Sequence, residues 1–207
     1  MLEHYIKTFN AIYPILHVPT TRCWLRELYV DLHACCIPSA TRLAFFLSIF
    51  ASSAYLSKDQ LQPEPATLGG RSLAAAPSEL WFGHAVSLLT RPPVPPSTQA
   101  LQAYTGLAYL CSQLEGLTES FGILTIFTLQ MSRSMKIHLL DSPRCREERQ
   151  KNGADMVDVE VKRRLWWHLA SSDWFVTIIL LSLIFFLPFF LIYFLVSFLY
   201  LTLTRMT

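Results

Sequence analysis

The sequence predicts an all-α body followed by a strongly hydrophobic C-terminal segment. Apolar residues of the body recur at helical spacing, and no run of alternating β-branched residues suggests a strand. The 207-residue chain is 52% hydrophobic and only 15% charged, whereas a soluble domain carries about 25% charged residues. No charged residue lies between Asp173 and Arg205. This composition excludes a disordered, a collagen-like and a disulfide-knot protein.

Breaks rich in proline, glycine or charge divide the body into helical segments. They lie at Pro14 and Pro19, across residues 57–70 and 91–97, and across the charged stretch 141–153. Within that stretch, residues 144–151 mix both signs of charge and are interpreted as a solvated loop. Helices are expected between these breaks. The first four are predicted at residues 2–13, 21–35, 39–55 and 72–89.

A helix capped by Ser97 and ended by Gly116 is expected next. The helical spacing of its apolar residues predicts one buried stripe, made of Leu101, Tyr104, Ala108, Cys111 and Leu114.

Two more helices are predicted in the rest of the body. One begins near Thr118 and presents Ile123, Phe127, either Gln130 or Met131, and Ser134 at helical spacing. The other begins after Gly153. Its stripe is Val157, Val161 and Leu165, and its i,i+4 ion pairs are Asp158 with Lys162 and Glu160 with Arg164.

The five cysteines are odd in number and irregular in spacing, and the first residues lack the features of a secretory signal. We therefore expect a reducing compartment and free, mostly buried thiols. His33, Cys35 and Cys36 form the one cluster of metal-ligating residue types. On a helix only His33 and Cys36 would share a face, and two ligands do not complete a tetrahedral zinc site. Helix packing is the preferred interpretation.

Motifs of catalysis are missing from the sequence. It contains no nucleophile elbow, Walker loop, dinucleotide fingerprint, zinc-protease helix or C-x-x-C pair. His17, His138 and His168 are candidates for a catalytic base, but a structural, hydrogen-bonded histidine is the simpler interpretation. With a net charge of +2, the chain has no overall attraction for nucleic acid. We expect a protein that is not an enzyme.

Ordered motifs run through the body. Residues 5–20 read Y-I-K-T-F-N-A-I-Y-P-I-L-H-V-P-T, residues 97–104 contain S-x-x-x-L-Q-A-Y, and residues 160–173 contain E-x-K-R-R-L-W-W followed by an aspartate. In this order, with shorter matches at 45–55 and 131–140, the motifs resemble the fungal-specific transcription factor domain, the middle homology region of fungal binuclear zinc-cluster transcription factors. The residues that carry the resemblance are Pro14, His17, Pro19, Gln102, Tyr104, Arg163, Arg164, Trp166, Trp167 and Asp173.

The resemblance implies an irregular multi-helix regulatory domain of nuclear location, without catalytic residues and with protein partners. It also implies that Trp166 and Trp167 are buried, while Arg163 and Arg164 join neighbouring helix ends. The family's C-x2-C-x6-C zinc-cluster array does not occur in the sequence. We therefore expect no zinc cofactor and no sequence-specific DNA binding by this chain. The similarity ends at Trp174, so residues 1–174 resemble the first half of the domain.

The hydrophobic segment 175–200 contains no charged residue. As a helix it would span about 39 Å, enough to cross a hydrocarbon core of about 30 Å. Basic residues 162–164 precede it, which predicts a cytosolic body and a short C-terminal tail, 201–207, beyond the membrane. A tail-anchored membrane protein is thus the alternative to a nuclear regulator. The Phe- and Leu-rich composition also fits translation past a splice site, which would make the chain a gene-model fragment.

Overall fold

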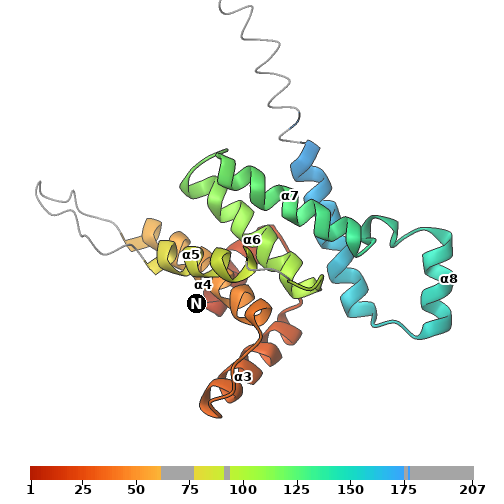
Figure 1. Cartoon of the computed structure of the whole chain (residues 1–207), viewed down its shortest axis with the longest axis horizontal. Helices are drawn as coiled ribbons and strands as arrows, with labels where there is room; N and C mark the ends of the chain where they lie inside the picture. The colour runs from red at the N-terminus through yellow and green to blue at the C-terminus, as the bar shows by residue number, and fades with distance from the viewer. Residues whose placement is uncertain (62–76, 91–93, 175–176, 178–207) are drawn as a thin grey trace, which may run out of the picture. The chain divides into compact units, whose positions relative to one another are not determined.

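The computed structural model describes residues 1–61, 77–90, 94–174 and 177. These residues are mostly helical and include no strand, so the all-α prediction is confirmed for them (Figure 1). The helices are α1 (Leu2–Lys7), α2 (Phe9–Ile12), α3 (Val18–His33), α4 (Ala40–Leu61), α5 (Pro77–Thr90), α6 (Thr98–Leu114), α7 (Glu119–Ser134), the short 3-10 helix η1 (Ile137–Leu139) and α8 (Pro143–Asn152). A last helical run covers residues 156–174.

The chain divides into two units, Met1–Trp166 and Trp167–Thr207. The packing described below is that of the first unit. In the second unit, residues 167–174 are helical. The hydrophobic segment 175–200 and the tail 201–207 lie outside the described residues, except for Thr177, so the membrane-spanning helix and the domain boundary at 174 stay predictions.

The predicted first helix is interrupted at Thr8, whose φ of −103° and ψ of −82° separate α1 from α2. The Thr8 hydroxyl donates to the backbone oxygen of His4 at 2.7 Å, a local bond that competes with regular helix hydrogen bonding. The two short helices bury aromatic rings. Phe9 packs against Tyr5 with 5.0 Å between ring centroids and against Tyr109 of α6 with 4.8 Å.

Helices α4, α5 and α6 form the core, with α4 packed against both of the others. Phe45, Phe46 and Ile49 of α4 are buried, and α6 is buried on most of its circumference. Gly106 of α6 faces Ser48 of α4 at an ordinary contact distance. A Cβ atom added at Gly106 of α6 would lie 3.7 Å from the Ser48 hydroxyl of α4.

Of the described helices, one stretch is long and apolar enough to cross a membrane by length and composition, residues Ala40–Ser57 of α4. In the structure 44% of that stretch is buried. Because α4 packs against α5 and α6, its hydrophobicity is explained by its place in the core.

The predictions for α6 are confirmed. The Ser97 hydroxyl accepts a hydrogen bond from the backbone N–H of Ala100 at 3.2 Å, as an N-cap does. Gly116 follows the helix with a φ of +79°. Along the predicted stripe, Leu101, Tyr104, Ala108 and Cys111 are buried and Leu114 is partly buried.

The prediction for α7 is wrong, because the buried side of the helix is displaced by about one residue from the predicted stripe. Leu124, Thr128 and Ser132 are the buried side chains, whereas Ile123 and Phe127 are 44% and 43% exposed. The hydroxyls of Thr128 and Ser132 donate to backbone oxygens of their own helix. Since the backbone satisfies these hydroxyls, the polar residues can face the core.

The solvated loop predicted at residues 144–151 is also wrong, because these residues lie in α8. Ser142 caps this helix by accepting from the backbone N–H of Cys145 at 3.4 Å, Pro143 begins it, and Gly153 ends it with a φ of +63°. None of its residues is buried. The Arg149 side chain donates to the Leu140 backbone oxygen and so connects α8 to the preceding turn.

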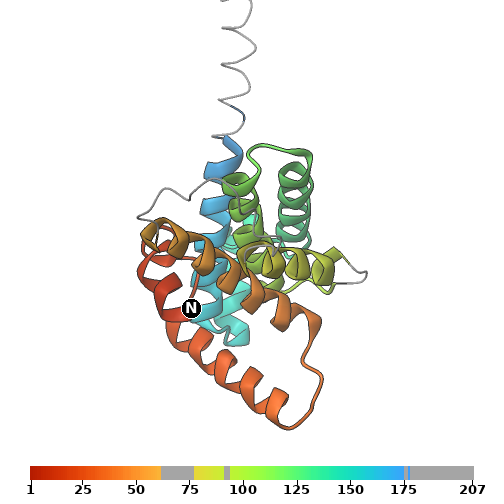
Figure 2. The ribbon, with the colours of Figure 1, turned by 90° about the vertical axis from the view of Figure 1, so that its left-hand side faces the viewer.

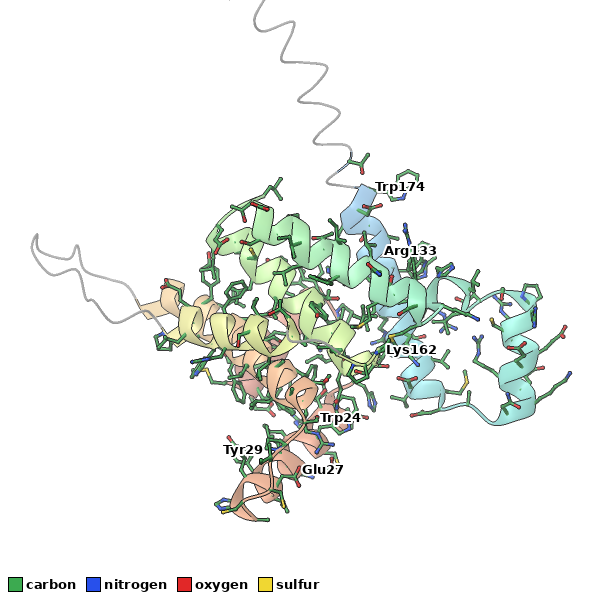
Figure 3. The ribbon with its side chains drawn as sticks, in the orientation of Figure 1. Trp24, Glu27, Tyr29, Arg133, Lys162 and Trp174 are labelled. Atoms are coloured by element: carbon green, nitrogen blue, oxygen red, sulfur yellow. The ribbon has the colours of Figure 1, made fainter. Side chains whose placement is uncertain are left out.

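Helices α3 and α4 form a hairpin whose far end projects from the rest of the unit (Figure 2). Arg42 of α4 holds the two helices together through ion pairs with Glu27 and Asp31 of α3, each at 3.3 Å. Trp24 contacts Phe45 with 5.9 Å between ring centroids, while Tyr29, further along α3, is 53% exposed (Figure 3). The outer half of α3 therefore has little cover.

Candidate functional site

The motif residues were predicted to be structural, and the structure brings several of them together. The corner 14–17 joins α2 to α3. Asn10 of α2 accepts from the backbone N–H of Leu16 at 3.0 Å, and Ile15 and Leu16 are buried. The side-chain amide of Asn10 thus folds the corner back onto the helix that precedes it.

His17 lies just before α3, which begins three residues earlier than predicted because Pro19 fits the first turn of a helix. The Nδ1 atom of His17 and the Thr20 hydroxyl are 2.7 Å apart. The backbone oxygen of His17 accepts from the Thr21 hydroxyl at 3.0 Å. The hydrogen bonding expected for His17 is present, and it organises the start of α3.

Gln102 joins the second motif to the corner. Its Nε2 atom donates to the backbone oxygen of Ile15 at 2.7 Å, although 87 positions separate the two residues in sequence. The Gln102 side chain is buried, and its Oε1 atom has no hydrogen-bond partner. The amide therefore serves as a donor that satisfies a buried backbone oxygen of the corner.

Tyr104 likewise satisfies a buried backbone oxygen, in this case one of α5. Its hydroxyl donates to the Leu89 backbone oxygen at 2.6 Å, in the last turn of that helix. The Tyr104 ring stacks on Phe127 of α7 with 5.9 Å between centroids. Burial raises the pKa of Tyr104, which keeps the hydroxyl protonated as a donor. Helix α6 thus binds the corner and α5 through two neighbouring side chains.

The basic residues of the third motif have different partners. Arg163 forms a two-pronged ion pair with Asp141, with N–O distances of 3.0 and 2.9 Å, and also bonds Glu160. Arg163 thus connects its helix to the turn that precedes α8. Arg164 instead pairs with Glu160 one turn earlier in its own helix, at 2.9 Å. The predicted pair of Asp158 with Lys162 is also present.

These ion pairs change the acidity of their carboxyl groups. The hydrogen bond from Arg163 lowers the pKa of Asp141. Hydrogen bonds from Arg164 and then Arg163 lower the pKa of Glu160. The same two carboxylates raise the pKa of Arg163. The side chains of these groups are partly exposed to solvent, so the ion pairs lie at the surface and are sensitive to salt.

The aromatic part of the third motif is only partly buried. The Trp166 ring lies 5.8 Å from the His138 ring, centroid to centroid, and Trp166 is half-buried. Trp167 is 65% exposed, so its prediction as a core residue is wrong. Consecutive positions of a helix point about 100° apart, and here the buried neighbours are Leu165 and Leu169. Asp173 is exposed.

The cysteines differ widely in their exposure. His33, Cys35 and Cys36 are exposed at the end of α3, and Cys23 is exposed too, so the prediction of mostly buried thiols is wrong. Only Cys111 is fully buried. In residues 1–61, 77–90 and 94–174, no three His, Cys, Asp or Glu side chains gather to hold a metal ion. Burial lowers the pKa of His168.

An apolar surface was not foreseen from the sequence. Ile123, Ile126 and Phe127 are 44%, 62% and 43% exposed and follow one another at i, i+3 and i+4 on α7; we call them the α7 face. Helix α7 packs on α6, and Phe127 lies at the edge of that contact, because its ring also stacks on Tyr104 of α6. The signal was available in the run I-L-T-I-F, which is apolar on both sides of a helix and so cannot be buried by one neighbour alone.

The chain is similar to curated fungal proteins that are named as transcription factors. It is 31% identical over 183 residues to the agnestins biosynthesis cluster transcription factor AgnL11 of Paecilomyces divaricatus, covering 86% of this chain and 26% of the relative. It is 30% identical over 184 residues to the probable transcription factor lepB of Aspergillus flavus, covering 86% of this chain and 32% of the relative.

A third relative, transcription factor TAS2 of Pyricularia oryzae, is 27% identical over 183 residues, which are 84% of this chain and 22% of TAS2. The chain thus spans about a quarter to a third of the length of the first two relatives. No family model matches the chain. No solved structure matches it either. The three relatives are all named as transcription factors.

Proposed function

We propose that this chain is a transcription-regulator-like protein whose helical body, 1–174, acts as a regulatory module. The observation that carries the proposal is its similarity to three proteins named as transcription factors, each over about 85% of the chain. Because the chain covers only a part of each relative, the activity of the whole relative is not transferred. The finer assignment, to the fungal-specific transcription factor domain, rests on the motifs in the sequence.

The contacts of the motif residues support that finer assignment. Gln102 bonds the corner at Ile15, and Tyr104 bonds the end of α5 at Leu89. Arg163 bonds Asp141, which precedes α8. These three motif side chains thus hold backbone or charge from another part of the body. We infer that the motif residues form a structural frame and that none of them has a catalytic role.

We infer that the body works through contacts with other proteins, without a cofactor of its own. The α7 face supports this, since exposed apolar side chains at i, i+3 and i+4 have the spacing of anchors in helix-mediated recognition. Sequence-specific DNA binding is not part of the proposal. The proposed location is the nucleus, in keeping with the names of the relatives.

Fractionation of cells that express the tagged full chain tests this proposal. The expected result is recovery of the chain with nuclear proteins. Recovery only in membranes, resistant to extraction with alkaline carbonate, would overturn it and favour the tail-anchored alternative suggested by the uncharged segment 175–200. A matched chain without residues 175–207 is the control. Its distribution should equal that of the full chain, whereas release from membranes would identify the segment as an anchor.

A further inference from the structure

Two neighbouring cysteines, Cys35 and Cys36, are exposed in the turn that joins α3 to α4. Cα atoms of consecutive residues are about 3.8 Å apart, so the two thiols are carried at the shortest spacing that a chain allows. In the part of the chain that the structure describes, the Cys35 thiol has no hydrogen-bond partner. The Cys36 thiol has only a long contact of 3.8 Å with the Ala34 backbone oxygen.

The backbone presents this pair in a fixed turn. The N–H of Cys35 donates to the Leu32 oxygen at 3.2 Å, and the N–H of Cys36 donates to the Asp31 oxygen at 2.9 Å. This pair of bonds is the Schellman motif, which ends helices at a left-handed residue. Cys35 is that residue, with a φ of +55°, where glycine is usual. The thiols are thus held at the end of a hydrogen-bonded turn.

The other cysteines do not share these properties. Cys111 is buried in α6, and burial raises the pKa of its thiol, which makes it unreactive. The Cys23 thiol is exposed but stands alone on α3 and contacts the Glu27 carboxylate at 3.5 Å. Cys145 is partly buried in α8. Within the described residues, only Cys35 and Cys36 offer two accessible thiols to one ligand.

Two sulfur atoms do not complete a zinc site. A zinc site needs four ligands or three with a water, and no third His, Cys, Asp or Glu of the described residues joins this pair in a metal-binding group. Soft thiolates prefer soft centres. We propose that Cys35 and Cys36 form a dithiol site for monosubstituted trivalent arsenic compounds, in which an organic group occupies the third position on arsenic.

The reaction balances without an oxidant. An arsenoxide of the form R–As=O meets two thiols, two As–S bonds form, and the As–O bond breaks. The two thiol protons leave with the oxygen atom as one water molecule. Arsenic stays trivalent and both sulfur atoms keep their oxidation state. The second As–S bond forms within one molecule, which strengthens binding by about a hundredfold or more over a single thiol.

Titration of the full chain with phenylarsine oxide, followed by intact mass spectrometry, tests the site. We expect one phenylarsenic group per chain, with loss of one water, resistant to excess monothiol and reversed by a dithiol. The variants Cys35→Ser and Cys36→Ser should each bind about a hundredfold more weakly. The matched control Cys23→Ser/Cys145→Ser should bind as the unsubstituted chain does, and circular dichroism verifies that each variant is folded.

Thiol footprinting gives a second result that needs no variant. With the arsenical bound, alkylation of Cys35 and Cys36 should be blocked, while Cys23 is alkylated at its usual rate. The proposal is overturned if the unsubstituted chain forms no dithiol-reversible adduct. It is equally overturned if the adduct persists in Cys35→Ser/Cys36→Ser or if the footprint maps to other cysteines.

Discussion

The hydroxyl of Tyr104 offers a one-atom test of the structural frame. It donates to the Leu89 backbone oxygen at 2.6 Å, and the two residues are only 3% and 2% exposed. Leu89 lies in the last turn of α5, where carbonyl oxygens have no partner within the helix. Tyr104→Phe removes the donor and leaves this oxygen buried. We expect the free energy of unfolding to fall by about 1 to 3 kcal/mol.

The substitution changes little else. The ring keeps its stacking on Phe127, so no cavity of the size of a side chain is created. Urea unfolding of the full chain, followed by tryptophan fluorescence, gives the free energy. The midpoint should fall while the slope stays constant, because the surface exposed on unfolding is unchanged.

Tyr29→Phe is the matched control, since Tyr29 is 53% exposed. It should change the free energy of unfolding by no more than about 0.5 kcal/mol. Equal midpoints for the two variants would refute the reasoning. A pH series adds a second check on Tyr104, whose pKa is raised by burial. Its contribution is present below the ordinary tyrosine pKa and is lost as the pH rises through the raised value, and the Phe variant lacks this loss.

Three further predictions follow from local geometry. Arg163→Gln should raise the pKa of Asp141 toward its ordinary value, because the hydrogen bond from Arg163 is the main cause of the lowering. A lowered carboxyl pKa stabilises the fold above the unfolded-state value, and this is lost as the pH falls through the folded-state pKa. The variant should therefore lose less stability between about pH 5 and pH 2 in urea titrations. Cys35→Gly should stabilise the fold by about 1 kcal/mol in urea unfolding, since its φ is +55°. Gly106→Ala should stabilise it by up to about 1 kcal/mol in the same assay, because the added Cβ would meet the Ser48 hydroxyl at an ordinary 3.7 Å.

A control variant or a contradicting result tests each of these three predictions. Arg164→Gln is the control for the first, since Arg164 pairs with Glu160. An equal effect of both variants on the Asp141 pKa, followed by NMR, would contradict the assigned cause. Cys36→Gly should bring no gain, because the positive φ belongs to Cys35. A fall in stability for Gly106→Ala would mean that α4 and α6 cannot accept the added methyl group.

The sequence predicts best where local and long-range signals agree. Ser97 and Gly116 mark the ends of α6, and the regular stripe between them matches its burial. The ion pairs of Lys162 and Arg164 follow directly from i,i+4 spacing. In these elements the conformation that each residue favours locally is also the one that the tertiary packing requires.

The predictions fail where a segment lacks an apolar periodicity or where its burial depends on residues distant in sequence. Helix α8 has no apolar stripe and no buried residue, so a periodicity argument has nothing to detect. In α7, threonine and serine face the core because their hydroxyls bond the helix backbone, which displaces the expected stripe. The bond from Gln102 to Ile15 spans 87 positions and has no local signature. Only the tertiary structure reveals such contacts.

The central claim is that the body acts on transcription through protein contacts. Its most direct test is to fuse the full chain to an unrelated DNA-binding module and to measure transcripts of a reporter gene that carries that module's site. The account predicts altered transcript levels relative to the module alone, at equal nuclear protein levels. It also predicts that Gln102→Glu, which buries a charge at the frame, abolishes the effect. Unaltered transcript levels with a nuclear, folded fusion would contradict the claim.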